Sequence, residues 1–258
     1  MKRLFLLIFI TIAALFSSYD LKAEAPERQG WELVFPLYGD VESVVITQYK
    51  LEEKFGEVVR GDIRLRVKYY FNDAGDVTEE AWYKSDGSLV SKSICKYDSR
   101  GNMIESADYD SDGSLRGKDI YKYDSQGNVI EEAWYYSDGS LDDKYIYKYD
   151  SSGNKIEYVW YDSDGSLFEK CIYKYDSSGN MIEEACYFSD GSLGEKWIYK
   201  YDSSGNMIEK ARYKSDGSLR EKRIYKYDSR GNVVEETEYQ GKAFTPVFLR
   251  VYEITFRN

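Results

Sequence analysis

The sequence predicts an all-β protein, an antiparallel meander of tandem β-hairpin repeats that forms a single curved or superhelical sheet. Three observations predict it: a 26-residue period, two glycine-containing turn signals in each unit, and stretches of about nine residues between turns that alternate with period two. Hydrophobic residues make up 42% of the chain and 27 of its residues are tyrosine, a composition that suits a folded protein with pleated, half-buried surfaces.

The period is set by a tyrosine that precedes aspartate. It recurs at intervals of 26 residues, at Tyr97, Tyr123, Tyr149, Tyr175, Tyr201 and Tyr227, and Phe71 holds the first place. These positions define a seven-unit array over residues 69–242.

The turn signals set the direction of the strands. Each complete unit carries a Gly-Asn or Gly-Asp, such as Gly127-Asn128, and an Asp-Gly, such as Asp138-Gly139. Glycine and asparagine accept the positive φ of tight turns, so consecutive strands are expected to be antiparallel neighbours. An open sheet of some fourteen strands is expected to coil into a curved ribbon or a partly closed superhelix, with too few units to close a shell.

Comparison of the units with one another predicts the register. The residue four before each repeated tyrosine varies together with the residue eleven after it, and five of the seven pairs are chemically complementary. The pairs are Val67/Trp82, Ser93/Asp108, Asp119/Trp134, Tyr145/Trp160, Cys171/Cys186, Trp197/Arg212 and Arg223/Glu238. If they face each other across the Gly-Asn turn, the same register sets Lys122 opposite Glu131, whereas a slip of one residue would oppose lysine to isoleucine.

This register makes Cys171 and Cys186 a disulfide candidate. Directly opposed strand residues lie within disulfide reach, and disulfides persist in exported proteins. Cys95 would then stay a free thiol, used as a small apolar residue.

The N-terminus is typical of a secretory signal peptide over residues 1–25. Lys2 and Arg3 precede an apolar run at 4–16, which is too short to span a bilayer, and cleavage after Ala25 or after Ala23 are the alternatives. We therefore expect an exported protein, periplasmic, on the outer surface or secreted, that is not integral to a membrane after signal cleavage.

The remaining segments lack the clean motif but still alternate. Residues 26–68 are predicted to be an N-terminal capping hairpin and residues 243–258 a C-terminal capping strand, because an open repeat sheet would otherwise expose two edges.

Composition argues against several function classes. The net charge of −11 disfavours nucleic acid as a partner, and the absence of histidine removes the usual general base and most zinc sites. The loop that begins Asp110-Ser111-Asp112-Gly113 resembles a calcium loop, but Tyr121 stands where a bidentate glutamate is needed. We expect no catalytic residues, no metal and no cofactor.

Two functions fit the pattern. The first is a structural or macromolecule-interaction scaffold for an unknown protein at the cell envelope. The second is a carbohydrate-binding module, because the variable aromatics Trp134, Tyr145, Trp160 and Trp197, with Trp82, would form one strip able to stack on sugar rings. Packing between units is the alternative role of that strip.

The motif Tyr-Lys-Tyr-Asp-Ser-Ser-Gly-Asn at 173–180 and 199–206 resembles the tyrosine–aspartate (YD) repeats of the RHS family. In that family the repeats form a spiralling β-ribbon, which encloses a toxin in a shell or occurs in cell-surface proteins. The resemblance implies a β-ribbon and an exported bacterial protein, and it implies no particular activity.

Overall fold

The computed structural model describes residues 37–241 and 244–257, and over these ranges the chain is all-β. Sixteen strands follow one another, each antiparallel to its neighbours in the chain. They are β1 (Val41–Lys54), β2 (Glu57–Phe71), β3 (Val77–Lys84), β4 (Leu89–Tyr97), β5 (Met103–Asp110), β6 (Leu115–Tyr123), β7 (Val129–Tyr136), β8 (Leu141–Tyr149), β9 (Lys155–Tyr161), β10 (Leu167–Tyr175), β11 (Met181–Phe188), β12 (Leu193–Tyr201), β13 (Met207–Lys214), β14 (Leu219–Tyr227), β15 (Val233–Gln240) and β16 (Thr245–Phe256).

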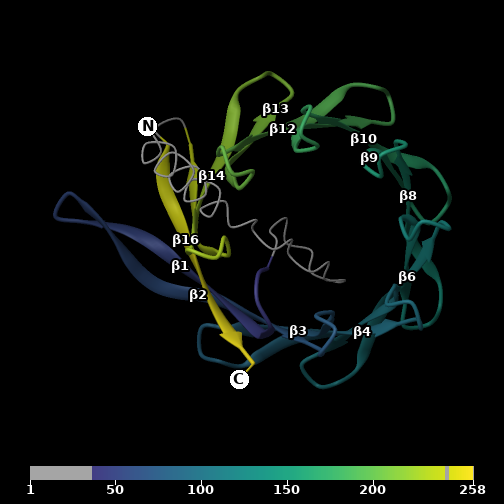
Figure 1. Ribbon diagram of the computed structural model, residues 1–258, viewed down its shortest axis with the longest axis horizontal. Coiled ribbons are helices and arrows are strands. Elements are labelled where there is room, and N and C mark those ends of the chain that lie inside the picture. The colour runs from purple at the N-terminus through teal and green to yellow at the C-terminus, as the bar shows by residue number, and fades with distance from the viewer. Residues whose placement is uncertain (1–36, 242–243, 258) are drawn as a thin grey trace, which may run out of the picture.

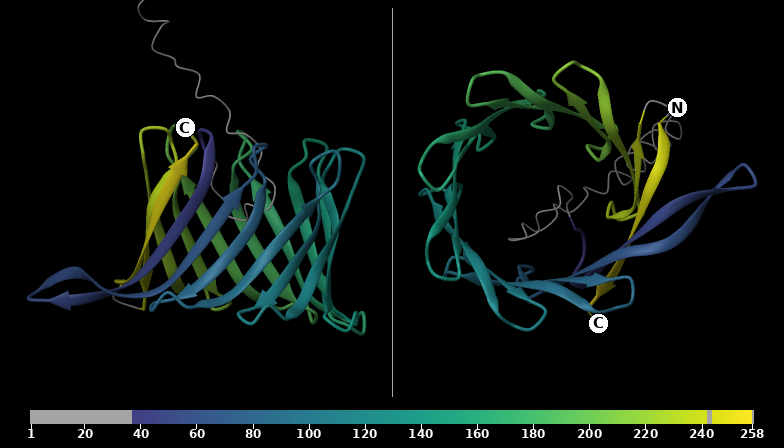
Figure 2. Two further views of the ribbon diagram at one scale, coloured as in Figure 1. Left: turned by 90° about the horizontal axis from the view of Figure 1, so that it is seen from below. Right: turned by 180° about the vertical axis from the view of Figure 1, so that it is seen from behind.

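The meander closes into a barrel, so the expectation of an open curved or superhelical sheet is wrong (Figure 1). β1 pairs with β16 through Val44↔Ile254 and Ile46↔Tyr252, among others. The strands tilt and twist in one sense around the ring (Figure 2). Closure gives every described strand a partner on both sides, which removes the two edges that an open ribbon would expose.

The terminal segments make the closure. Residues 41–71 form the predicted hairpin, as β1 and β2, and residues 245–256 form the final strand, but these segments pair with each other and cap no free edge. The predicted signal peptide lies outside the described residues. Within the described ranges no helix has the length and apolar character needed to cross a membrane.

The predicted register is confirmed at all seven variable pairs, for example Tyr145↔Trp160 and Arg223↔Glu238. Lys122 lies opposite Glu131 as predicted. The turns fix this register. In the turn between β6 and β7, Gly127 has a φ of 91°, and the pairing of the two strands shifts by a β-bulge between Lys122↔Glu131 and Tyr123↔Val129.

Successive residues of each strand alternate between the lumen and the outside. One cavity is lined by Ile46, Val67, Trp82, Arg223, Glu236 and Tyr252, which come from six neighbouring strands. Six neighbouring strands of a closed barrel can share a cavity only on its concave face, so these side chains point into the lumen.

The intervening residues form a charged outer face. Glu157 forms ion pairs with Lys148 on one neighbouring strand and with Lys170 on the other, each with an N···O distance of 2.6 Å. The Lys148 side chain is 62% exposed. Equivalent lysine–glutamate pairs recur in five of the six other units, such as Lys122–Glu131 at 2.6 Å, and the first unit has Tyr70 opposite Glu79 instead. A ladder of ion pairs therefore runs around the outside of the barrel.

The repeated tyrosine ties adjacent strands together at one end of the barrel. Each hydroxyl donates to the backbone carbonyl of the residue 20 positions earlier, as Tyr123 does to Met103 at 2.7 Å. The same bond is made by Tyr97, Tyr149, Tyr175, Tyr201 and Tyr227. The main hydrophobic core lies on the inner wall near the β1–β16 closure, around Val41, Val44 and Val67.

Candidate ligand-binding site in the barrel lumen

The positions that vary between repeats point into the lumen. Both residues of the variable pairs Asp119/Trp134 and Val67/Trp82 line cavities of the lumen. Tyr145 and Arg223 line these cavities as well. The repeated lysines and glutamates lie on the outside. The barrel therefore keeps a constant outer frame and varies the chemistry of its inner wall.

One inner cavity of about 430 Å³ lies over strands β6 to β9. It is lined by Asp119, Glu132, Trp134, Asp142, Asp143, Tyr145, Tyr147 and Tyr158. We call this set the acidic–aromatic wall. Its volume falls in the range of small-molecule sites.

The aromatic rings of this wall form a connected group. Tyr145 stacks on Tyr158, with 5.7 Å between ring centroids, and lies 5.8 Å from Trp160. Tyr147 contacts Tyr158 at 5.6 Å, and Phe168 packs behind Trp160 at 4.1 Å. Packing fixes the orientation of these rings before any ligand arrives.

Neutral donors hold the carboxylates in place. Trp160 Nε1 donates to Asp143 Oδ1 at 2.7 Å, and the Tyr145 hydroxyl donates to Asp143 Oδ2 at 3.3 Å. The Tyr147 hydroxyl donates to Glu132 at 2.5 Å. Burial, reinforced by the Glu132 charge, raises the pKa of Tyr147 far above its ordinary value, so this phenol stays protonated.

Lys155 lies beside this wall and departs from the repeat. Its ammonium lies over the rings of Tyr147, at 5.4 Å, and Tyr173, at 4.7 Å. The neighbouring units have Val129 and Met181 at the same position. Burial lowers the pKa of Lys155, and the charges of Glu184 and Glu132 oppose this effect.

The structure brings three of the four predicted stacking aromatics together. Trp134 and Tyr145 line the cavity, and Trp160 packs against Tyr145. Trp197 lies apart on β12, with the Lys210 ammonium over its ring at 4.3 Å and the Arg212 guanidinium at 5.2 Å. Cations therefore already occupy the ring of Trp197.

Sequence reasoning did not single out five residues of the wall. Tyr147 belongs to the repeated Tyr-Lys-Tyr-Asp motif, so its position does not vary in a way that marks a site. Tyr158 stands where neighbouring units have Glu132 and Glu184, so the comparison of repeats that found Trp134 carried a signal for it too. Asp142, Asp143 and Glu132 belong to acid-rich positions with no distinctive pattern.

The opposite part of the inner wall is rich in arginine. The second cavity, of about 290 Å³, is lined by residues that include Arg64, Arg223, Arg250 and Glu236. Arg250 pairs with Glu236 and, at 3.2 Å, with Glu238. Tyr252 also donates to Glu236, at 2.9 Å. We call this set the arginine–glutamate wall.

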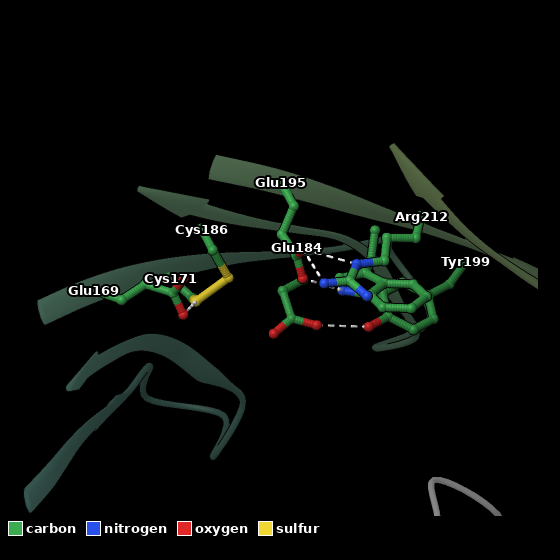
Figure 3. The surroundings of a disulfide bond; sticks show 8 residues. Glu169, Cys171, Glu184, Cys186, Glu195, Tyr199 and Arg212 are labelled. Atoms are coloured by element: carbon green, nitrogen blue, oxygen red, sulfur yellow. Dashed lines mark hydrogen bonds and ion pairs between the residues drawn. A yellow bond between two sulfur atoms is a disulfide. The ribbon is translucent and has the colours of Figure 1, made fainter. Parts of the chain in front are cut away.

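Cys171 and Cys186 are disulfide-bonded between β10 and β11 (Figure 3). Tyr158 of the acidic–aromatic wall packs against them. Tyr199 donates to Glu184 nearby, at 2.7 Å. Glu169 and the two cysteines are the one group of three close potential metal ligands in residues 37–241 and 244–257. Because the sulfurs are bonded to each other, this group offers no thiolate to a metal.

Comparison with known proteins supports the fold and assigns no activity. A family described only as "Uncharacterised protein" matches residues 137–252. No curated protein matches the chain. A porin-like protein from Bacteroides uniformis is similar in structure, with a TM-score of 0.56, 10% identity, and coverage of 83% of this chain and 98% of that one.

Two further solved structures are more distant. The complex TcdB2-TccC3-Cdc42 gives a TM-score of 0.36 at 13% identity, over 81% of this chain and 14% of that one. A LolA superfamily protein from Nitrosomonas europaea gives 0.33 at 8% identity, over 86% and 88% of the two chains. The porin-like match agrees with a closed antiparallel barrel.

Proposed function

We propose that this protein is an exported, non-catalytic binding protein that holds a carbohydrate against the acidic–aromatic wall of its lumen. One observation carries the proposal: Trp134 and Tyr145, two of the predicted stacking aromatics, line one cavity together with carboxylates. Aromatic faces stack on the apolar faces of sugar rings, and carboxylate oxygens accept hydrogen bonds from sugar hydroxyls.

The outer surface favours this function over a scaffold. The outward lysine–glutamate ladder repeats from unit to unit and marks no special place on the outside. The variable residues face the lumen instead. Specific recognition therefore fits the inside of the barrel better than the outside.

The same ladder bears on the compartment. A barrel embedded in lipid needs an apolar outward band, and outward lysines are costly there. Lys122 and Lys148 are 64% and 62% exposed on the outer face. We therefore propose a barrel surrounded by water in an exported compartment, periplasmic or outside the cell, and we retain membership of the YD-repeat group as part of this proposal.

The test is glycan binding by wild-type protein and two variants. Trp134→Ala removes a ring from the wall, and Trp197→Ala removes a ring that Lys210 and Arg212 already cover. We expect Trp134→Ala to weaken binding by about tenfold or more and Trp197→Ala to leave it within about twofold, because a stacked ring contributes on the order of 1–2 kcal/mol. Isothermal titration calorimetry measures both affinities, and circular dichroism checks the fold. Failure of the wild type to bind any oligosaccharide on an array, or equal losses in both variants, would overturn the proposal.

A further inference from the structure

We infer that the acidic–aromatic wall selects a cationic carbohydrate, an oligosaccharide of amino sugars with protonated amines. This inference rests on the proposed function and names the substrate class of that site. It depends on three features of the wall: its excess of carboxylates, its ring faces, and its contrast with the arginine–glutamate wall.

The lining of the cavity carries a net negative charge, and the ammonium beside it, that of Lys155, interacts with Glu132 and Glu184. Asp119, Glu132, Asp142 and Asp143 are lining residues, whereas none of the described residues that line the cavity is lysine or arginine. Asp143 accepts hydrogen bonds from the Trp160 indole N–H and the Tyr145 hydroxyl, and Glu132 accepts one from the Tyr147 hydroxyl; all three donors are neutral. Such donors fix the geometry of a carboxylate and leave its charge in place. A ligand that carries ammonium groups would form charge-assisted hydrogen bonds with carboxylates such as those of Asp142 and Asp143.

The rings of the lumen already bind ammonium groups in this molecule. Lys155 Nζ lies 4.7 Å from the centroid of Tyr173, and Lys210 Nζ lies 4.3 Å from that of Trp197. Both are cation–π contacts on the inner wall. Tyr145, Tyr158 and Trp134 offer the same type of surface beside the carboxylates, so the wall combines both elements that recognise an organic ammonium.

The rest of the lumen gives the contrast. The second cavity is lined by Arg64, Arg223 and Arg250, and its glutamates are engaged by those arginines. Three arginines and one glutamate, Glu236, which pairs with Arg223 and Arg250, leave a positive lining that would repel a ligand amine. Charge therefore places a cationic ligand on the β6–β9 side of the barrel.

Three tetrasaccharides with one β-1,4 backbone test this inference, because they differ only at carbon 2. They are the tetramers of glucosamine, of N-acetylglucosamine and of glucose. Each is titrated by calorimetry into the protein without its predicted signal peptide, at low salt and at a pH where the amine is protonated. We expect the glucosamine tetramer to bind about tenfold or more tightly than the glucose tetramer, the effect of one charge-assisted hydrogen bond. Raising the salt concentration should reduce this ratio.

Two double variants with the same net charge distinguish the effect of the wall carboxylates from the effect of the protein's overall negative charge. Asp142→Asn/Asp143→Asn removes two charges from the wall, and Asp112→Asn/Asp216→Asn removes two from exposed turns. The glucosamine preference should fall by about tenfold in the first variant and stay within about twofold in the second.

The outcomes distinguish the inference from the proposed function. Equal affinity of wild type for all three tetramers, with binding lost in Trp134→Ala, would overturn the inference and leave the carbohydrate function standing. A similar loss of preference in both double variants would overturn the inference as well. Binding of spermidine with no binding of any oligosaccharide would overturn both.

Discussion

Two regions of the inner wall fill the same pair of repeat positions with opposite chemistry. Asp119 and Trp134 face each other on β6 and β7, and Arg223 and Glu238 face each other four units later on β14 and β15. The first pair lines an aromatic cavity that is rich in carboxylates, and the second joins a network of ion pairs. The same strand pairing therefore accommodates either kind of residue pair, so one pair can serve binding in one unit and another pair can serve stability in another unit.

Burial explains why the arginine–glutamate wall belongs to stability. Glu236 is 3% exposed, forms an ion pair with Arg250 and accepts a hydrogen bond from the Tyr252 hydroxyl, so its charge is buried and paired. Its counterpart in the acidic–aromatic wall is Glu132, which is held by the Tyr147 hydroxyl. Removal of one partner of a buried ion pair leaves the other charge without compensation.

The largest expected effect comes from truncating these two equivalent glutamates. Glu236→Ala should lower the free energy of unfolding by about 3 kcal/mol, because it removes a buried carboxylate shared by Arg250, Arg223 and the Tyr252 hydroxyl and leaves Arg250 with Glu238. Glu132→Ala, the matched control, should cost about 1 kcal/mol, the value of one hydrogen bond to a phenol. Urea unfolding followed by tryptophan fluorescence measures both. Equal losses would mean that the two walls do not differ in the way described.

A third solution to the same pair of positions is the disulfide. Cys171 and Cys186 enclose a loop with a sequence separation of 15, so its loss should cost about 3 kcal/mol through chain entropy. Reduction of wild type, compared with a Cys171→Val/Cys186→Val variant insensitive to reductant, checks this in urea. A midpoint that reductant leaves unchanged in wild type would contradict it.

Replacing the Asp119/Trp134 pair with an arginine–glutamate pair tests whether these two positions determine oligosaccharide binding. Asp119→Arg/Trp134→Glu copies the Arg223/Glu238 pair into β6 and β7, where the frame is the same. The variant should fold and should lose oligosaccharide affinity by about tenfold or more, because it removes a ring and adds a cation. Calorimetry measures the affinity and circular dichroism the fold. Retained affinity in a folded variant would show that this pair does not determine binding.

The smallest expected effect concerns Lys155. Lys155→Met restores the residue type of Met181 and should stabilise the protein by about 1 kcal/mol at neutral pH, because it removes a partly buried charge. Burial lowers the pKa of Lys155, so the folded state releases this proton at lower pH than the unfolded chain does. Wild-type stability then rises with pH between the lowered pKa and the ordinary value of about 10.4.

The gap between wild type and Lys155→Met should therefore shrink across that alkaline window. Melting temperatures of the two proteins at a series of pH values measure the gap. Arg223 stays charged throughout, since nearby glutamates raise its pKa, so the arginine–glutamate wall should show no such change. A gap that is constant with pH would contradict the assigned role of the charge.

Particular residues show how far sequence reasoning reached into the site. Trp134, Tyr145 and Trp160 were identified because their positions vary while the frame repeats, and the structure brings them together. Trp197 shares the same pattern but lies with Lys210 and Arg212. The pattern reports which face a residue points to and, for Trp197, its partner Arg212 across the turn, but it does not report that the Lys210 ammonium lies over the same ring.

The sequence by itself determined the strands, their turns and their register, because each depends on contacts between residues close in the chain. Glycine at each reversal and complementary residues across it specify every hairpin locally. Only the tertiary structure decided that Val44 would meet Ile254, because closure depends on twist and tilt accumulated over all sixteen strands. That closure turns the variable face inward and converts a strip of aromatic residues into the wall of a cavity.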